Sequence, residues 1–97
     1  MNQAPQQLKL IVNGSATSTG ARWPGGKGLF SAVGTFAGAT VALQYLLPDG
    51  TTWYTPASAS MTAAGGLVFE LPQVNIRAYV TGGPPSGMYV NADWIPE

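Results

Sequence analysis

The sequence contains no cysteine and no histidine. The absence of cysteine excludes a disulfide framework and any metal site built from thiolates. The absence of histidine removes the commonest general base, the commonest metal ligand and the usual pH switch near neutrality. An enzyme would have to rely on a pair of carboxylates or on a serine paired with a lysine, and no spacing in the chain supports either. We therefore expect a protein that is not an enzyme, with no catalytic residues, no metal ligands and no cofactor.

Charged residues are also scarce. They make up 8% of the chain, as four basic and four acidic residues, whereas soluble domains contain about 25%. Nucleic-acid binding depends on many Lys and Arg contacts to phosphates, so this balance argues against a nucleic-acid partner. The surface has to consist largely of Thr, Ser, Gln, Asn, Gly and Ala. Covering such a surface strands few charges, which favours contacts with other proteins.

Long apolar runs are missing too. No stretch approaches the roughly 20 residues that cross a bilayer. Residues 1–7 lack the basic segment and the apolar core of a secretory signal. We therefore expect no membrane partner, and a protein that is made and folded in a cytoplasm.

The chain does contain a series of short segments with β-strand character, and residues 40–55 predict a central hairpin. Four apolar side chains alternate along residues 40–47 and share one face: Val41, Leu43, Tyr45 and Leu47. This period of two predicts a half-buried strand. Pro48-Asp49-Gly50 supplies a turn, because proline fixes φ and glycine tolerates a positive φ. Residues 51–55 return as the second strand.

Further strands are predicted at residues 8–13, 27–36, 67–71, 74–80 and 88–95, with an ambiguous extended segment at 57–64. In the first of them we expect Leu8, Leu10 and Val12 to face the core. About seven short strands without a helix predict an all-β protein, a single small antiparallel β-sandwich or barrel. The domain covers residues 8–97, and residues 1–7 form a flexible N-terminal arm.

Aromatic side chains and the two chain ends are the candidates for a binding surface. Trp and Tyr are favoured at protein interfaces and can also stack on sugars. Trp23 either covers the end of the core or offers its ring to a partner. Trp94 and Ile95 point to opposite faces, so one of the two should be poorly buried. The predicted interface residues are Gln6, Gln7, Trp23, Tyr54, Tyr79, Trp94 and Ile95.

Two groups of motifs carry a resemblance to a known class of proteins. The first group is Trp23-Pro24-Gly25-Gly26-Lys27-Gly28 to Phe36, Ala39-Thr40-Val41-Ala42-Leu43-Gln44 and Pro48-Asp49-Gly50-Thr51-Thr52-Trp53. The second group is Leu71-Pro72, Val74-Asn75-Ile76-Arg77-Ala78 and Gly82-Gly83-Pro84-Pro85-Ser86-Gly87-Met88-Tyr89. In this order, over roughly residues 22–92, the chain resembles small all-β virion proteins of tailed bacteriophages, of the head-decoration (cement) or head-fibre kind.

The resemblance implies a β-sandwich or barrel that binds the outer face of a capsid, often as a trimer, and it transfers no catalytic residues. We therefore expect a non-enzymatic virion structural protein, a capsid decoration protein that is assembled in the host cytoplasm and located on the capsid surface. Its partners would be the major capsid protein or other virion proteins, and further copies of itself in a trimer. The attachment element would be the arm at residues 1–7 or the C-terminal residues 94–97. The alternatives are a tail, fibre or baseplate domain, and a carbohydrate-binding β-sandwich with an exposed Trp/Tyr pair.

Overall fold

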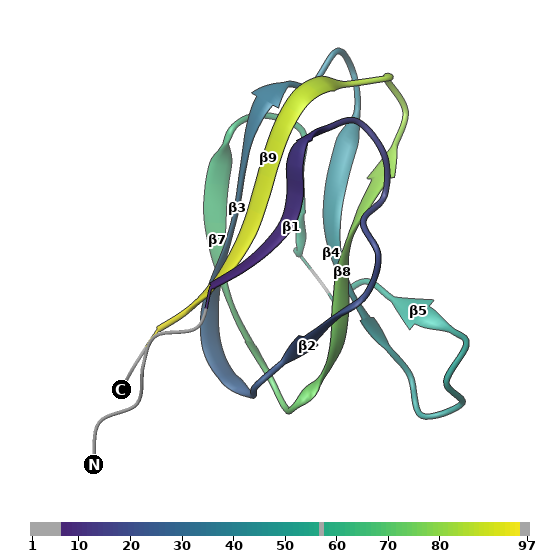
Figure 1. The fold of residues 1–97 in the computed structure, drawn as a ribbon, viewed down its shortest axis with the longest axis vertical. Helices are drawn as coiled ribbons and strands as arrows, with labels where there is room; N and C mark the ends of the chain where they lie inside the picture. Colours follow the sequence, from purple (N-terminus) through teal and green to yellow (C-terminus); the bar gives the residue numbers. More distant parts are fainter. Residues whose placement is uncertain (1–6, 57, 96–97) are drawn as a thin grey trace.

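The chain folds into two antiparallel sheets that pack face to face, as Figure 1 shows. The computed structural model describes residues 7–56 and 58–95. These residues form nine strands and no helix. The predicted all-β class is therefore confirmed, and the architecture is a sandwich of two sheets, not a closed barrel. No helix long and apolar enough to cross a bilayer occurs within the two described ranges.

The first sheet has four strands in the order β1-β9-β3-β7. Their bounds are β1 Gln7–Gly14, β9 Ser86–Trp94, β3 Gly26–Thr35 and β7 Gly65–Leu71. The second sheet has five strands, with β2-β8-β4-β5 as its main order and β6 also paired with β4. Their bounds are β2 Ala21–Trp23, β8 Val74–Thr81, β4 Thr40–Leu46, β5 Trp53–Tyr54 and β6 Ser60–Met61.

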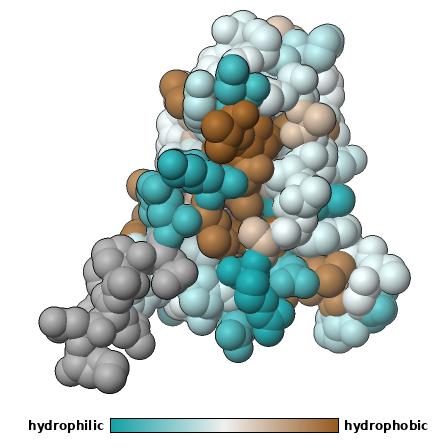
Figure 2. Space-filling model, in the orientation of Figure 1, coloured by the Kyte–Doolittle hydropathy of each residue, from teal (hydrophilic) through white to brown (hydrophobic). Residues whose placement is uncertain are grey.

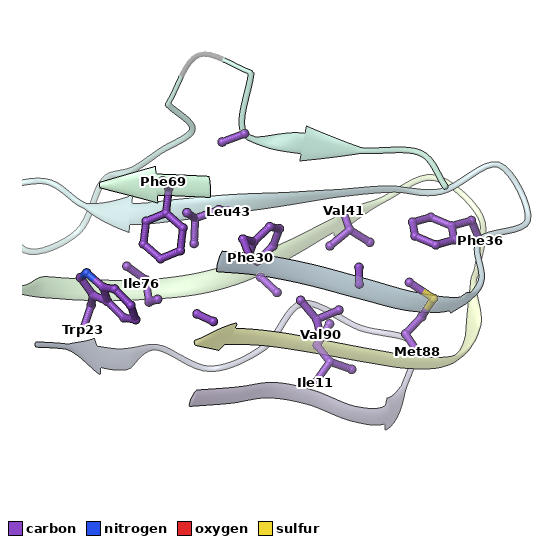
Figure 3. Close-up of a cluster of buried hydrophobic side chains, with 14 residues drawn as sticks. Ile11, Trp23, Phe30, Phe36, Val41, Leu43, Phe69, Ile76, Met88 and Val90 are labelled. Atoms are coloured by element: carbon purple, nitrogen blue, oxygen red, sulfur yellow. The ribbon is translucent and has the colours of Figure 1, made fainter. Parts of the chain in front are cut away.

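The core lies between the sheets and is filled from alternate positions of the long strands (Figure 3). The largest fully buried side chains are Trp23, Phe30, Leu43, Ile76, Met88, Val41 and Val90. In β8, Ile76 and Ala78 are fully buried while Val74 and Val80 pack against the same cluster, as the alternation predicts. Each large apolar side chain that is removed from water contributes about 1.5–3 kcal/mol, so this cluster is the main source of stability.

The predicted central hairpin is present. β4 and β5 are joined by a turn in which the Gly50 N–H donates to Leu47 O at 3.0 Å and the Leu47 N–H donates to Thr52 O at 2.8 Å. Gly50 has φ +78°, as the turn requires. β5 is shorter than predicted, and of the ambiguous segment at 57–64 two residues form β6, while residue 57 lies outside the described residues.

The inward face of β1 differs from the prediction. Ile11 is buried, whereas Val12 is 60% exposed. The cause is a register shift between Lys9 and Ile11 in the pairing with β9, which inserts Leu10 as an extra residue and exchanges the two faces of the strand beyond it. Val12 is therefore wrong as a core residue, while Leu8 and Leu10 are half-buried against the core. Gln7, assigned to the arm, is the first residue of β1, and residues 1–6 lie outside the described residues.

A second difference concerns the segment before β3, where no strand was predicted. Ala21–Trp23 forms a three-residue strand along β8, with Trp23 opposite Val74. Trp23 is fully buried, and its ring and that of Phe69 point toward each other at one end of the core, with centroids 4.8 Å apart (Figure 3). Covering the end of the core is therefore its role. The prediction that Trp23 is an exposed interface residue is wrong, because its ring lies inside its own chain.

Candidate functional site

The outward side of the four-stranded sheet carries most of the large hydrophobic residues that are exposed in the described part of the chain. We call this side the outer face. Among residues 7–56 and 58–95, five large hydrophobic residues are exposed, and four of them lie on it: Val12, Val33, Val68 and Tyr89, which are 47–61% exposed. Monomeric proteins seldom leave several such side chains together on one surface unless that surface binds something.

Strand register arranges the outer face in rows. Val12 on β1, Tyr89 on β9 and Val33 on β3 lie opposite one another, and so do Leu29 on β3 and Val68 on β7. Between these apolar rows runs a polar row of Lys9, Asn91 and Ser31. Rows on one face are about 6.6 Å apart, because the side chains of a strand alternate. The outer face therefore carries mainly apolar and polar side chains in alternate rows, and Asp93 continues the row of Leu29 and Val68 onto β9.

The outer face is electrically balanced. Two basic residues, Lys9 and Lys27, and two acidic residues, Glu70 and Asp93, point to this side, and Lys27 lies opposite Glu70 in the ladder. Asp93 Oδ1 is buried and has no hydrogen-bond partner among the described residues. A surface with no net charge presents little electrostatic barrier to a neutral partner.

Apolar surface also continues along β1. Figure 2 shows apolar side chains in a strip over β1, with hydrophilic side chains above it, to its left and below it, and pale, nearly neutral surface to its right. Leu8 and Leu10 on this strand are half-buried and pack against the core cluster from its margin. The side of the molecule at β1 is therefore less polar than the composition alone would indicate.

The outward side of the five-stranded sheet carries a different arrangement, which we call the arginine cluster. Arg77 on β8 places its guanidinium carbon 4.5 Å from the ring centroid of Trp53 on β5 and 5.2 Å from that of Tyr79. Its Nε donates to Gln44 Oε1 at 2.8 Å, and Gln44 Nε2 donates to Thr55 Oγ1 at 3.1 Å. Gln44 is 8% exposed, and these two hydrogen bonds satisfy its buried amide.

The arginine cluster bears directly on sugar binding. A sugar platform needs an open aromatic face, but the guanidinium of Arg77 covers one face of the Trp53 ring. Tyr54 is 52% exposed and meets Tyr45 edge-on, with ring centroids 5.7 Å apart. Trp53 and Tyr54 therefore do not form one flat aromatic pair, and the cluster acts mainly as a tie among β4, β5 and β8.

Asp49 is held by its neighbours in the hairpin turn. The pKa of Asp49 is lowered to about 2, first by the Thr52 hydroxyl, which donates to its carboxylate at 2.6 Å, and then by the Thr51 and Thr52 N–H groups. These hydrogen bonds hold the hairpin turn, so Asp49 is a turn residue. Within the described ranges, no three residues of the ligating types lie together as a potential metal site.

The predicted interface residues do not form one surface. Gln7 pairs with Asp93 near the end of β9, where Trp94 and Ile95 are both half-buried. Neither is poorly covered, contrary to expectation, since Trp94 packs against the core and the Ile95 N–H donates to Lys27 O at 2.9 Å. Tyr54 lies on the hairpin and Tyr79 in the arginine cluster, while Gln6 lies outside the described residues.

The outer-face residues were missed for an identifiable reason. Leu67, Val68 and Phe69 are apolar at three consecutive positions, so an apolar side chain must lie on each side of that strand. Residues 29–33 are also apolar on both sides of their strand: Leu29 and Val33 lie on one side, and Phe30 and Ala32 lie on the other. Apolar residues on both faces of a strand are the signal that one face is covered by something else, although only the partner strands show which face it is.

Comparison of this chain with protein-family models, curated proteins and solved structures finds no match.

Proposed function

We propose that this chain is a non-enzymatic structural protein of a tailed-bacteriophage virion, a capsid decoration protein that attaches to the capsid surface through its outer face. The observation that carries the proposal is the gathering of Val12, Val33, Val68 and Tyr89 on one electrically balanced sheet face. The motif resemblance to head-decoration proteins supports the choice of partner. The outer face is thus assigned the attachment role expected of the chain ends.

The mechanism follows from the composition of that face. Burying apolar surface stabilises a complex by about 25 cal/mol per Å², and few charges have to lose water on the outer face. One contact of this kind is modest. A capsid repeats its binding surface many times, however, so a decoration protein that bridges neighbouring subunits gains from high effective concentration. Stabilisation of the shell then comes from the number of bound copies and from the way each one bridges neighbouring subunits. No single site has to bind exceptionally tightly.

Binding to capsids that lack this protein is the direct test. We expect the purified chain to sediment with such capsids and to raise the temperature at which they rupture. Val33→Asp should weaken binding by roughly tenfold or more, because it places a carboxylate in an interface with no partner for it. Thr81→Asp adds the same charge at an exposed position of β8 in the other sheet and should bind like the unmodified chain.

Two results would overturn the proposal. One is a folded chain that does not bind capsids lacking this protein, and the other is an equal loss of binding in Val33→Asp and Thr81→Asp. Negative-stain images with an antibody against this chain separate a head location from a tail, fibre or baseplate location. A glycan array that detects binding, with a change in tryptophan fluorescence on addition of the sugar, would favour the carbohydrate-binding alternative.

A further inference from the structure

The four-stranded sheet ends in two strands whose outer sides meet no other strand among the described residues, β1 and β7. The second sheet differs. β5 and β6 lie along one side of β4, and β2 lies along β8, where Thr17 and Ser18 also bond to the backbone of Val80 and Ala78. Exposed strand edges are templates for pairing with another chain, so proteins usually protect them.

β1 carries such protection. Its pairing with β9 shifts register twice, between Lys9 and Ile11 and between Val12 and Gly14, and Asn13 adopts φ +52°. Bulges twist an edge away from flat pairing, and Lys9 adds a charge. β1 is therefore a poor template for a second chain.

β7 has no bulge of this kind. It pairs with β3 over seven consecutive residues without a register shift, from Gly65 opposite Ala32 to Leu71 opposite Gly26. It contains no proline and a single charge, Glu70. In Figure 1 it is the outermost strand on the left of the molecule. β7 is thus a long, regular and mostly apolar edge.

We propose that β7 pairs antiparallel with β7 of a second copy of this chain, about a two-fold axis at Val68. The strand spans Gly65–Leu71, so this centre is the one that pairs all seven residues. Each side chain then meets a compatible one: Val68 faces Val68, Leu67 faces Phe69, and Glu70 faces Gly66 of the second copy. Aliphatic and aromatic cross-strand pairs of this kind stabilise sheets.

Repulsion between like charges disfavours the nearest alternative position of the two-fold axis, at the next outward-facing residue. A two-fold axis at Glu70 would set two carboxylates directly opposite each other, which is destabilising. An axis at Gly66 would place half of the pairing outside the strand, in residues 61–64. At the Val68 centre the two Glu70 carboxylates lie on opposite sides of the axis, each next to Lys27 of its own copy in the ladder. Of the two-fold axes through outward-facing residues of β7, the one at Val68 is therefore the most favourable.

The pairing joins the two outer faces. The row of Leu29 and Val68 continues through the axis into Val68 and Leu29 of the second copy, and the two four-stranded sheets become one sheet of eight strands. The inference does not depend on the proposed function, since it concerns the chain alone. It commits to a two-fold dimer and not to the trimer that the family resemblance implies.

Sedimentation equilibrium of the full chain tests the pairing. We expect a reversible dimer of twice the 10.0 kDa chain mass. Val68→Lys should weaken dimerisation by roughly tenfold or more, because two like charges then meet at the axis. Val33→Lys is the matched control: it makes the same change on the same outer face, at 56% exposure against 61% for Val68, but away from the edge. This variant should remain a dimer.

A charge swap gives the sharpest readout. Val68→Glu alone should dimerise as weakly as Val68→Lys, whereas an equimolar mixture of the two variants should form heterodimers, because opposite charges then meet across the axis. Circular dichroism and thermal melting of each variant verify the fold, which a change at an exposed position should leave intact. A monomer at every concentration, a trimer, or equal dissociation of Val33→Lys and Val68→Lys would overturn the proposal.

Discussion

Gly28 is buried where Trp23 and Phe69 meet, and its lack of a side chain is what allows that contact. A Cβ at this position would lie 2.5 Å from Cη2 of Trp23 and 2.7 Å from Cζ of Phe69. The cause is steric, because both rings are held inside the core and cannot retreat without disturbing their neighbours. Gly28 therefore allows the rings of Trp23 and Phe69 to pack directly over the backbone of β3.

We predict that Gly28→Ala destabilises the chain by about 1–3 kcal/mol, the usual cost of overpacking a core. Chemical denaturation measured by tryptophan fluorescence gives the free energy of unfolding directly. Near-ultraviolet circular dichroism should change as well, because Trp23 has to shift.

Gly65 provides the control for this prediction. A Cβ at Gly65 meets no atom within 4 Å, so Gly65→Ala should leave the free energy of unfolding unchanged or raise it slightly, by restricting the unfolded chain. Equal losses in the two variants would show that strand glycines matter here through the backbone, and would contradict the steric explanation.

At the scale of elements, the arginine cluster holds the projecting hairpin onto the sheet. Arg77 belongs to β8, Gln44 to β4 and Trp53 to β5, so their contacts connect three strands. β5 itself pairs with β4 through only Tyr54 and Trp53. A ladder so short contributes little by itself, and side-chain contacts with Arg77 have to supply much of its order.

We predict that Arg77→Ala lowers the free energy of unfolding by about 1–3 kcal/mol, because the buried Gln44 oxygen loses its donor and two rings lose their cation. Arg77→Lys should show a smaller loss, since lysine keeps the charge but lacks the planar guanidinium and its Nε–H. The readouts are chemical denaturation and the amide exchange of β5, which should quicken.

Arg22 serves as the comparison for Arg77. It is the other arginine of the chain, it is exposed on β2, and Arg22→Ala should change the stability by less than about 0.5 kcal/mol. If Arg22→Ala were as costly as Arg77→Ala, the effect would come from net charge and not from the cluster.

The same elements show how much of the structure can be predicted from the sequence. In β8 the alternation of Val74, Ile76, Ala78 and Val80 is unbroken, so the local period alone predicts the faces that the structure shows. In β1, Leu10 is an extra residue only in relation to β9, where no residue is paired with it. A bulge therefore depends on the partner strand and cannot be seen in the local sequence. β2 was missed because three residues between Gly20 and Pro24 show no periodicity.

The candidate site was harder to predict than the fold for a related reason. The sequence shows that Val33 and Val68 lie on strands with apolar side chains on both sides, but a face becomes outward only once the second sheet has covered the other one. Aromatic residues drew attention as interface anchors, yet Trp23 proved to be fully buried and Tyr79 is engaged by Arg77. Aliphatic side chains on both faces of a strand are a weaker signal, because the sequence does not show which face stays exposed.

At the scale of the whole molecule, the two proposals act together. Pairing of β7 strands joins two outer faces into one surface, so a dimer would meet a repetitive capsid surface with two copies of the same binding patch. The second contact is then intramolecular, which raises the apparent affinity without any new kind of interaction. Val68→Lys should therefore weaken capsid attachment by more than the loss of one exposed valine explains, because it also separates the two copies of the dimer.

The electrical balance of the outer face leads to the last prediction: attachment to capsids should depend weakly on salt. Raising the salt from about 0.05 M to about 0.5 M shortens the screening length severalfold and reduces association that charge pairs drive, but Lys9, Lys27, Glu70 and Asp93 leave this face with no net charge. We expect the dissociation constant from co-sedimentation to change by less than about threefold over this range, whereas association driven by many charges loses orders of magnitude in affinity.

Calorimetry should show a negative heat-capacity change on binding, because the buried surface is apolar. A steep loss of affinity with salt, and a heat-capacity change near zero, would instead assign attachment to charged residues outside the apolar rows, with Arg22 and Arg77 as the first to replace.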